Sequence, residues 1–298
     1  MSQVMRGTPA GDAYLDLQNQ ARRAKRPTDE LHQLYALEGF LARLALSSAA
    51  GKFVLKGGML LAAFDMRRPT RDVDLAALAL DDDVDTVLAL MRRIIATPQP
   101  TNDGLGFDLD SLSAETIRDE EEYAGIRVSV DVRLATAKLR FHIDVNIGDP
   151  IWPQPVRVLI PRLRGGDPIE LAGYPLPMVL AEKCVTAVQR GTANTRWRDF
   201  ADVYRLIRRH SVNGAELHRA CMEVAAHRKA TLLQLAIVLD GYAELAQIKW
   251  AAWRRRQGFD DLPEDFSIVL STVVAFADPA LTGMLDDFIW RPDSQSWR

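Results

Sequence analysis

FVLKGGMLLAAF at residues 53–64 and RPTRDVDL at residues 68–75 are the two stretches that specify the core of this chain. The first begins with an apolar run that predicts a strand, and two glycines separate this run from a predicted helix over Met59–Phe64. In the second stretch Val73 and Leu75 alternate with two aspartates, which predicts a strand with one apolar and one acidic face. This order of elements predicts a site beside the glycine turn.

The residue types of these stretches indicate which chemistry the site performs. Gly57 and Gly58 let the backbone approach a triphosphate closely, and the N-terminus of the following helix favours anions. Asp72 and Asp74 are two residues apart on a strand, so both carboxylates face the same way and can share Mg²⁺ or Mn²⁺. Lys56 can balance phosphate charge. We therefore predict a site for a nucleoside triphosphate (NTP) and a divalent cation.

A third carboxylate can complete this metal site. Alternating apolar and polar residues predict a hairpin whose strands cover residues 128–134 and 139–147. Asp144 lies on the polar face of the second strand, and Asp131 on the first strand is its competitor. We favour Asp144 because its neighbours are strongly apolar, whereas Asp131 can equally pair with a basic side chain across the hairpin.

The rest of the chain predicts an α+β protein with a helical C-terminal part. The segments whose apolar periodicity predicts helices are residues 31–49, 84–95, 180–188, 200–207, 215–226 and 232–245. We expect an irregular acidic stretch before the hairpin, a loop over residues 150–177, and domains at residues 1–165 and 166–298. Lys183 lies off the apolar face of its helix, so we expect its removal to cost stability within ~0.5 kcal/mol.

Composition and charge bound the class of protein. The 298 residues carry a net charge of −3, and no apolar run approaches the ~18 residues that span a bilayer, so we expect a cytoplasmic protein without membrane contact. Cys184 and Cys221 offer neither a disulfide framework nor a zinc cluster, and the sequence has no P-loop motif. Residues 183–230 hold ten basic and four acidic side chains, a balance of +6 that can hold a polyanion.

These motifs resemble the nucleotidyltransferase superfamily of DNA polymerase β type, whose signature is a glycine turn followed by Asp-x-Asp or Asp-x-Glu. More narrowly, KGGM at residues 56–59 together with RPTRDVDL resembles the AbiEii/AbiGii toxin family, which includes the MenT toxins. The resemblance continues through YAGIR at residues 123–127, IDVNIGD at residues 143–149, EK at residues 182–183 and RWRDF at residues 196–200. It covers roughly Phe53 to Leu206.

The resemblance implies a nucleotidyltransferase-type mixed β-sheet core with flanking helices, followed by a helical C-terminal domain. It implies catalytic roles for Asp72, Asp74, Lys183 and Asp199, with Asp202 as the alternative to Asp199. The implied nucleotide-binding residues are Lys56, Gly57, Gly58, Arg71, Arg190 and Arg198. It further implies transfer of a nucleoside monophosphate (NMP) from an NTP to RNA, at the 3′ end of tRNA, with release of pyrophosphate. Growth inhibition and control by an antitoxin encoded nearby follow from the same resemblance.

Three other activities share parts of this pattern. A small-molecule nucleotidyltransferase of the antibiotic-modifying kind would have the same site, although the basic stretch after Lys183 favours RNA. A kinase-like phosphotransferase would release ADP in place of pyrophosphate. A non-catalytic RNA-binding module would need metal, because three carboxylates near a phosphate site repel RNA.

Thr70 is a candidate for regulation. It stands two residues before Asp72, so its hydroxyl projects to the face of the carboxylates if the strand already begins there. A phosphate on this hydroxyl would add about −1.5 to −2 charges beside the metal ligands and would switch the enzyme off. Alternatively, the hydroxyl shapes the turn after Pro69 by bonding to nearby backbone.

Overall fold

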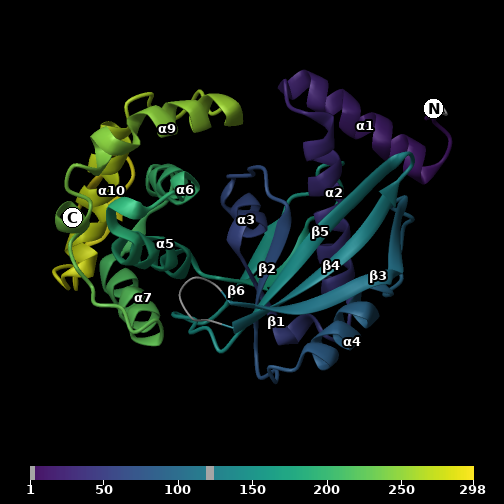
Figure 1. Ribbon diagram of the computed structural model, residues 1–298, viewed down its shortest axis with the longest axis horizontal. Coiled ribbons are helices and arrows are strands. Elements are labelled where there is room, and N and C mark those ends of the chain that lie inside the picture. The colour runs from purple at the N-terminus through teal and green to yellow at the C-terminus, as the bar shows by residue number, and fades with distance from the viewer. Residues whose placement is uncertain (1–3, 119–123) are drawn as a thin grey trace. The chain divides into compact units, whose positions relative to one another are not determined.

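The computed structural model describes residues 4–118 and 124–298 and divides the chain into two compact units (Figure 1). The first unit consists of Met1–Asp149 and Val156–Tyr174, and the second of Pro150–Pro155 and Pro175–Arg298. The domain boundary predicted at residue 165 precedes a strand that pairs within the first unit, and the chain passes finally into the second unit at Pro175. Tyr123, which belongs to the resemblance described above, lies outside the described residues.

The first unit is built on a mixed seven-stranded sheet with the strand order β3-β4-β5-β2-β1-β7-β6. The strands are β1 (Phe53–Lys56), β2 (Asp72–Ala77), β3 (Leu105–Arg118), β4 (Ala124–Leu134), β5 (Ala137–Ile147), β6 (Val156–Ile160) and β7 (Ile169–Gly173). β2 runs antiparallel to β1 and parallel to β5, and β1 runs parallel to β7. The predicted hairpin is confirmed as β4 and β5. The acidic strand therefore lies between the strand of the glycine turn and the strand of Asp144.

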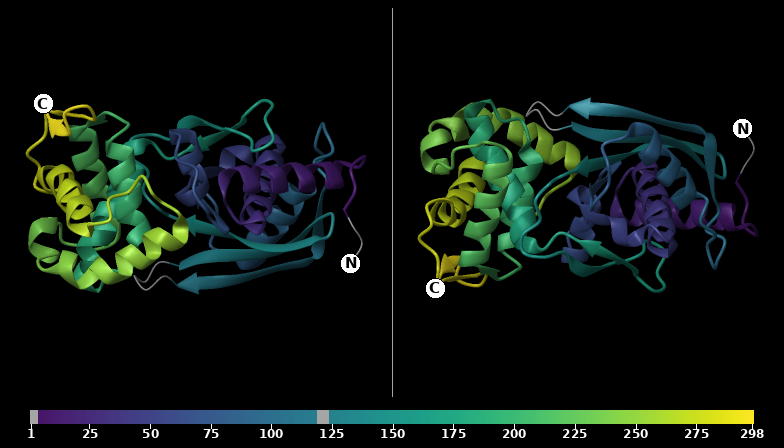
Figure 2. Two further views of the ribbon diagram at one scale, coloured as in Figure 1. Left: turned by 90° about the horizontal axis from the view of Figure 1, so that it is seen from above. Right: turned by 90° about the horizontal axis from the view of Figure 1, so that it is seen from below.

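Helices pack against this sheet, as Figure 2 shows. The helical segments of this unit are α1 (Pro9–Ala24), α2 (Thr28–Leu46), η1 (Ala50–Lys52), α3 (Gly57–Leu60), η2 (Leu61–Phe64) and α4 (Val84–Ile95). α2 and α4 contact each other and the strands, where Val128 and Phe141 are fully buried. The helix predicted at residues 84–95 is confirmed with the same bounds, and the one predicted at residues 31–49 begins earlier, at Thr28, and ends earlier, at Leu46.

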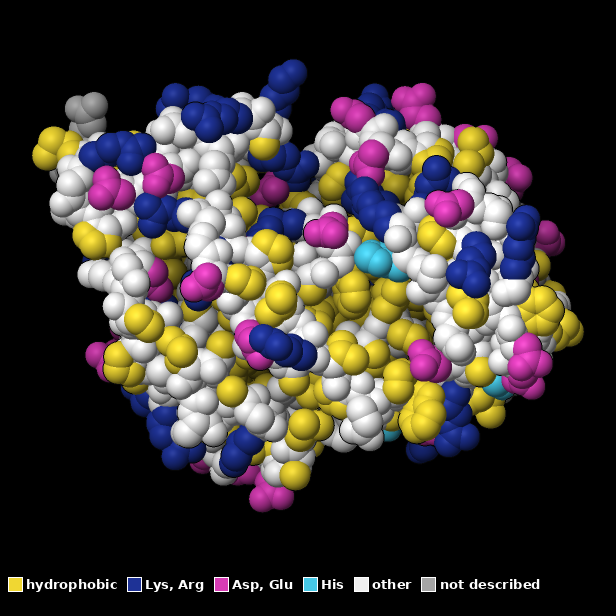
Figure 3. Space-filling view, turned by 180° about the vertical axis from the view of Figure 1, so that it is seen from behind, with side chains coloured by type: hydrophobic (Ala, Val, Ile, Leu, Met, Phe, Trp, Pro, Cys, Tyr) yellow, Lys and Arg dark blue, Asp and Glu magenta, His cyan; other side chains and the backbone are white. Residues whose placement is uncertain are grey.

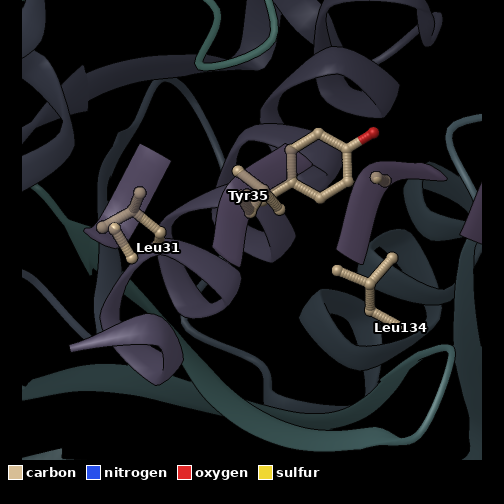
Figure 4. Packing of buried hydrophobic residues seen from close by; sticks show 6 residues of the cluster. Leu31, Tyr35 and Leu134 are labelled. Atoms are coloured by element: carbon tan, nitrogen blue, oxygen red, sulfur yellow. The ribbon is translucent and has the colours of Figure 1, made fainter. Parts of the chain in front are cut away.

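α1 was not predicted, because its apolar face is narrow. Ala13, Leu17 and Ala21 are fully buried, but only Leu17 among them is a large side chain. These residues pack against Leu31 and Tyr35 of α2 and against Leu134 of β4, the three residues labelled in Figure 4. A fully buried leucine contributes about 1.5–3 kcal/mol, so the burial of Leu17 is a substantial part of what holds α1 against α2 and β4.

Two segments expected to be irregular form strands instead. The acidic stretch before the hairpin contains β3, in which partly buried Leu105, Phe107 and Leu109 alternate with exposed residues. β3 lies at the edge of the sheet, where charged side chains are tolerated and protect against pairing with other chains. The loop expected over residues 150–177 contains β6 and β7, whose five-residue runs are hidden in the sequence by flanking prolines and glycines.

The second unit is helical, as predicted. Its elements are α5 (Leu176–Arg190), η3 (Gly191–Ala193), α6 (Trp197–Ile207), β8 (Val212–Asn213), α7 (Gly214–His227), α8 (Leu235–Val238), α9 (Tyr242–Gln257), α10 (Phe266–Leu281), β9 (Ile289–Arg291) and β10 (Ser296–Trp297). The single helix predicted at residues 232–245 is wrong, because Gly241 at φ +69° separates α8 from α9. No helix within residues 4–118 and 124–298 is both long and apolar enough to cross a membrane. The fold class is α+β, with a mixed sheet and flanking helices followed by a helical unit.

Candidate functional site

Three carboxylates from two neighbouring strands meet in the first unit. Asp72 and Asp74 alternate with buried Val73 and Leu75 on β2, as predicted, so both aspartates face away from the core. β5 runs parallel to β2 in a register that places Asp144 directly beside Asp74. One oxygen from each of Asp72, Asp74 and Asp144 lies within 4.8 Å of the other two. Carboxylate oxygens at this spacing are the ligands that Mg²⁺ and Mn²⁺ prefer, so the three residues fit a divalent cation.

The glycine turn makes room for one of these carboxylates. Gly57 has φ +64°, and a Cβ atom at this position would lie 1.8 Å from Oδ2 of Asp74. The backbone N–H of Gly58 points toward the same oxygen at 3.4 Å. The two glycines therefore permit the close approach of the turn to Asp74, in addition to the role toward a triphosphate that we predicted for them.

The site concentrates negative charge. Burial, and then the charge of Asp72, raise the pKa of Asp74 to about 7, while the ammonium of Lys56 acts in the opposite direction. Lys56 itself forms an ion pair with Asp149, at 2.6 Å between Nζ and Oδ2. Lys56, which we predicted to contact phosphate, therefore already contacts a carboxylate in this structure. A carboxylate held at such a high pKa is a site where added positive charge is strongly favoured.

Arg127 is part of this site and was missed as a functional residue. Its Nε and Nη2 atoms donate hydrogen bonds to Oδ1 and Oδ2 of Asp144 at 2.8 and 2.7 Å. These hydrogen bonds raise the pKa of Arg127. The strand alternation on β4 contained a signal for this contact, because Arg127 lies directly opposite Asp144 in the register of the hairpin.

Asp131, the competitor for the third carboxylate, lies elsewhere on the hairpin. It faces Arg140 at 3.7 Å, and both side chains are about half exposed. Asp144 and not Asp131 is therefore the residue that the structure brings together with Asp72 and Asp74. His142, next to Asp72 in the strand register, contacts the hydroxyl of Ser129 through Nδ1 at 2.9 Å.

Thr70 contacts the site directly. Its hydroxyl donates a hydrogen bond to Oδ1 of Asp72 at 2.6 Å, although β2 begins only at Asp72. The side chain is buried. The hydroxyl thus binds a carboxylate of the site, a partner that neither of our two interpretations of Thr70 specified.

A second cluster of charged residues lies in the second unit. Lys183 on α5 donates to Oδ1 of Asp199 at 2.8 Å and to Oδ2 of Asp202 at 2.9 Å, both on α6. Arg196 also contacts Asp199, at 2.8 Å. The expectation of a lysine whose removal costs little does not fit this setting, because the Lys183 side chain is only 13% exposed and Asp202 is almost fully buried. Both candidates for the functional acid contact the same ammonium group.

The remaining predicted nucleotide-binding residues differ in exposure. Arg71 and Arg198 are exposed, and Arg190 is partly buried. Of the ten basic side chains in residues 183–230, at least five form ion pairs, namely Lys183, Arg196, Arg205, Arg219 and Arg228. On the face shown in Figure 3, basic and acidic side chains are interspersed. Arg205 and Arg228 pair with Asp261 and Glu182, which lie outside this stretch, so the sequence balance of +6 overstates the positive charge available to a polyanion.

Comparisons with known proteins identify the family of this chain. Residues 39–272 match the model of a family described as nucleotidyl transferase AbiEii toxin of type IV toxin–antitoxin systems. The crystal structure of JHP933 from Helicobacter pylori superimposes with a TM-score of 0.49 and 13% identity, over 86% of this chain and 94% of that one. None of the curated proteins compared with the chain matches it. Because the family match spans the acidic strand, the glycine turn and the Lys183 cluster, the chain belongs to the AbiEii family of nucleotidyl transferase toxins.

Proposed function

We propose that this protein transfers an NMP from an NTP to RNA, with the 3′ end of tRNA as acceptor, in a reaction that depends on Mg²⁺ or Mn²⁺ and releases pyrophosphate. The observation that carries the proposal is the meeting of Asp72, Asp74 and Asp144 oxygens within 4.8 Å of one another. The family match supports a nucleotidyl transferase, and NTPs and tRNA are both cytoplasmic, where we expect the protein to act.

The residues of the first unit divide the work. Asp72, Asp74 and Asp144 would hold the cation, and the turn at Gly57 and Gly58 would lie against the triphosphate. A bound divalent cation neutralises phosphate charge and lowers the pKa of an attacking hydroxyl. The protein's own contribution is to align the α-phosphorus with the acceptor hydroxyl, so that a new P–O bond forms as the bond to pyrophosphate breaks.

For the second unit we propose that Lys183 and Asp199 contribute to nucleotide use, and that the exposed Arg198 and the partly buried Arg190 contribute positive charge. Lys183→Arg keeps the positive charge but changes its geometry. We expect this variant to raise KM for the NTP at least severalfold while the protein stays folded. Unchanged kinetics in a folded Lys183→Arg protein would restrict Lys183 to a structural role.

The test uses the protein with total RNA, Mg²⁺ and NTPs labelled at either the α- or the γ-phosphate. We expect α-label in tRNA and no γ-label. Oxidising the tRNA with periodate destroys the 3′-terminal diol, so the same tRNA after oxidation should accept nothing. γ-label in RNA would indicate a kinase-like activity, α-label on an aminoglycoside but not on RNA would indicate a small-molecule enzyme, and RNA binding without labelling would indicate a binding module.

The family also motivates a proposal about control. We propose that a cognate antitoxin encoded nearby relieves the growth inhibition, and that phosphorylation of Thr70 is one route to inactivation. Thr70 is buried against Asp72, so a kinase could reach its hydroxyl only after the segment before β2 opens. Mass spectrometry after co-expression with the neighbouring gene tests for the modification. An unmodified Thr70, together with a Thr70→Glu variant as active as the wild type, would remove the support for this route.

A further inference from the structure

Arg127 holds the one carboxylate of the triad that lies on β5. Its guanidinium contacts both oxygens of Asp144, in the side-on geometry that makes arginine–carboxylate pairs strong and directional. An oxygen of the same carboxylate lies within 4.8 Å of oxygens of Asp72 and Asp74. A cation bound among the three aspartates would therefore act on the same carboxylate as the guanidinium of Arg127.

The charges around the triad explain why a cationic side chain lies here. Three carboxylates this close repel one another, and each needs a positive partner or a proton. The ammonium of Lys56 also acts on Asp74, and it is shared with Asp149 at 2.6 Å. Without a divalent cation, Arg127 supplies a direct counter-charge to the triad, through Asp144.

The position of Arg127 also allows it to leave Asp144. The Arg127 side chain is 34% exposed, whereas that of Asp144 is 12% exposed, so the acid is enclosed and the base is partly open to solvent. On its other side, Arg127 lies directly opposite Glu115 of β3 in the strand register. Glu115 is exposed and offers a second carboxylate within reach of a long side chain, without any change in the backbone.

We propose that Arg127 is an internal counter-ion that competes with the divalent cation for Asp144. In the metal-free protein it neutralises and orders the carboxylate, and it gives up at least one Asp144 oxygen when the cation binds. This inference rests on the proposed function in one respect, that the triad binds a divalent cation. It predicts that the affinity for metal alone is held below the value that the three carboxylates would otherwise give.

The test measures Mn²⁺ binding to the full chain without nucleotide, by titration calorimetry and by the electron paramagnetic resonance signal of free Mn²⁺. We expect Arg127→Gln to bind Mn²⁺ about tenfold more tightly, because a competing charge-assisted contact is gone. Arg140→Gln is the matched control. Arg140 lies on the next strand, its side chain is on the same face of the sheet as that of Arg127, and it contacts Asp131 at 3.7 Å. Its loss changes net charge equally, and we expect less than a twofold effect on Mn²⁺ affinity.

Two further variants make the outcome specific to Asp144. In an Asp144→Asn background, Arg127→Gln should no longer change Mn²⁺ affinity, because the contested group is absent. If Arg127→Gln does not fold, Arg127→Lys retains the charge and loses the two-pronged contact, and we expect its Mn²⁺ affinity to rise severalfold.

Several results would overturn the proposal. Weaker Mn²⁺ binding by Arg127→Gln would mean that Arg127 positions Asp144 for the metal. Unchanged binding would mean that the ion pair and the metal site are independent, and an equal gain in Arg140→Gln would reduce the effect to net charge. Because Mn²⁺ binding is measured without RNA or NTP, a failure of the nucleotidyl transfer assay leaves this result readable on its own.

Discussion

Each unit contains a cluster of charged residues that includes predicted site residues, and the two clusters differ in how well their charges are balanced. In the first unit, Asp72, Asp74 and Asp144 lie together, the guanidinium of Arg127 contacts Asp144, and the ammonium of Lys56 acts on Asp74 while it pairs with Asp149. In the second unit, Lys183 lies between Asp199 and Asp202. Arg196 adds a second positive charge to that group at 2.8 Å from Asp199.

The Lys183 cluster therefore supports the fold in addition to the role in nucleotide use that we propose for Lys183 and Asp199, whereas the triad has the charge imbalance that favours binding of a cation. Two acids and two bases in mutual contact satisfy one another, so breaking the Lys183 cluster leaves buried charge unpaired. The triad of the first unit instead raises the pKa of Asp74 to about 7, mainly through burial and then through the charge of Asp72. Such a group destabilises the metal-free protein at neutral pH, and this cost is expected where function requires the charges.

The largest expected effect follows from replacing Asp74 with Asn. Loss of a partner that merely orients a metal ligand costs roughly 10–100-fold, so loss of a ligand should lower nucleotidyl transfer by at least about 100-fold. Stability should change in the opposite direction. A carboxylate whose pKa is raised in the folded state favours folding below its unfolded pKa, and this contribution is lost as pH rises through about 7.

Metal-free Asp74→Asn should therefore melt a few degrees higher than the wild type at pH 8, and this difference should vanish below about pH 4. Thermal melting in the presence of a chelator, beside the α-label assay, measures both effects. An Asp74→Asn protein that transfers nucleotide normally would contradict the assignment of the metal ligands. One that melts lower at pH 8 would contradict the charge imbalance.

The second effect is a loss of stability in the other cluster. Lys183→Ala leaves Asp199 and Asp202 buried without their ammonium partner, which typically costs about 3–5 kcal/mol. Urea denaturation measures this cost. Arg198→Ala is the control, because Arg198 is exposed on the same helix as both acids and its loss should stay within about 0.5 kcal/mol. A cost below about 1 kcal/mol for Lys183→Ala would show that the cluster does not hold the fold.

A third prediction concerns the turn beside the triad. Gly57→Ala places a methyl group where Oδ2 of Asp74 lies, and it imposes φ +64° on a residue with a Cβ atom. The backbone strain alone costs roughly 1–2 kcal/mol, and Asp74 must also move, so both stability and transfer should fall. Gly51→Ala is the matched control, because its Cβ would have no atom within 4 Å. If the two variants lost equal stability and equal transfer activity, the turn at Gly57 would have no specific role in the site.

The smallest expected effect lies at the rim of the Lys183 cluster. The Arg196 side chain is 39% exposed, so its ion pair with Asp199 is screened by solvent. Arg196→Gln should lower the free energy of unfolding by less than about 1 kcal/mol, and less so in high salt. A loss of unfolding free energy as large as that of Lys183→Ala would mean that the partly exposed Arg196 stabilises the cluster as much as the largely buried Lys183 does.

Local patterns predicted the triad and its strands, but not the contacts that depend on register. Asp72 and Asp74 could be assigned because two residues on one strand face the same way, and Asp144 because its neighbours alternate with it. The pairing of Arg127 with Asp144 depends on the exact register of the predicted hairpin, which the alternation indicates but does not fix. The pairing of Lys56 with Asp149 requires knowledge of which strand and loop meet.

The errors in the fold have the same physical origin. β3 was missed because an edge strand tolerates the acidic residues that otherwise indicate a loop. β6 and β7 were missed because short strands between prolines and glycines carry too few residues to show a period. The setting of Lys183 was misjudged because its partners come from the next helix, where Asp199 and Asp202 are three residues apart and share a face.

The most direct test of a metal-dependent transferase at Asp72 and Asp74 counts products. Pyrophosphate and labelled RNA are measured in the same reaction, with Mg²⁺ or with a chelator, for the wild type and for Asp72→Ala. We expect one pyrophosphate per incorporated nucleotide in the wild type with Mg²⁺, and neither product with chelator or in an Asp72→Ala protein that melts like the wild type. Full transfer by Asp72→Ala, or transfer that persists in the chelator, would contradict the central role of the acidic triad.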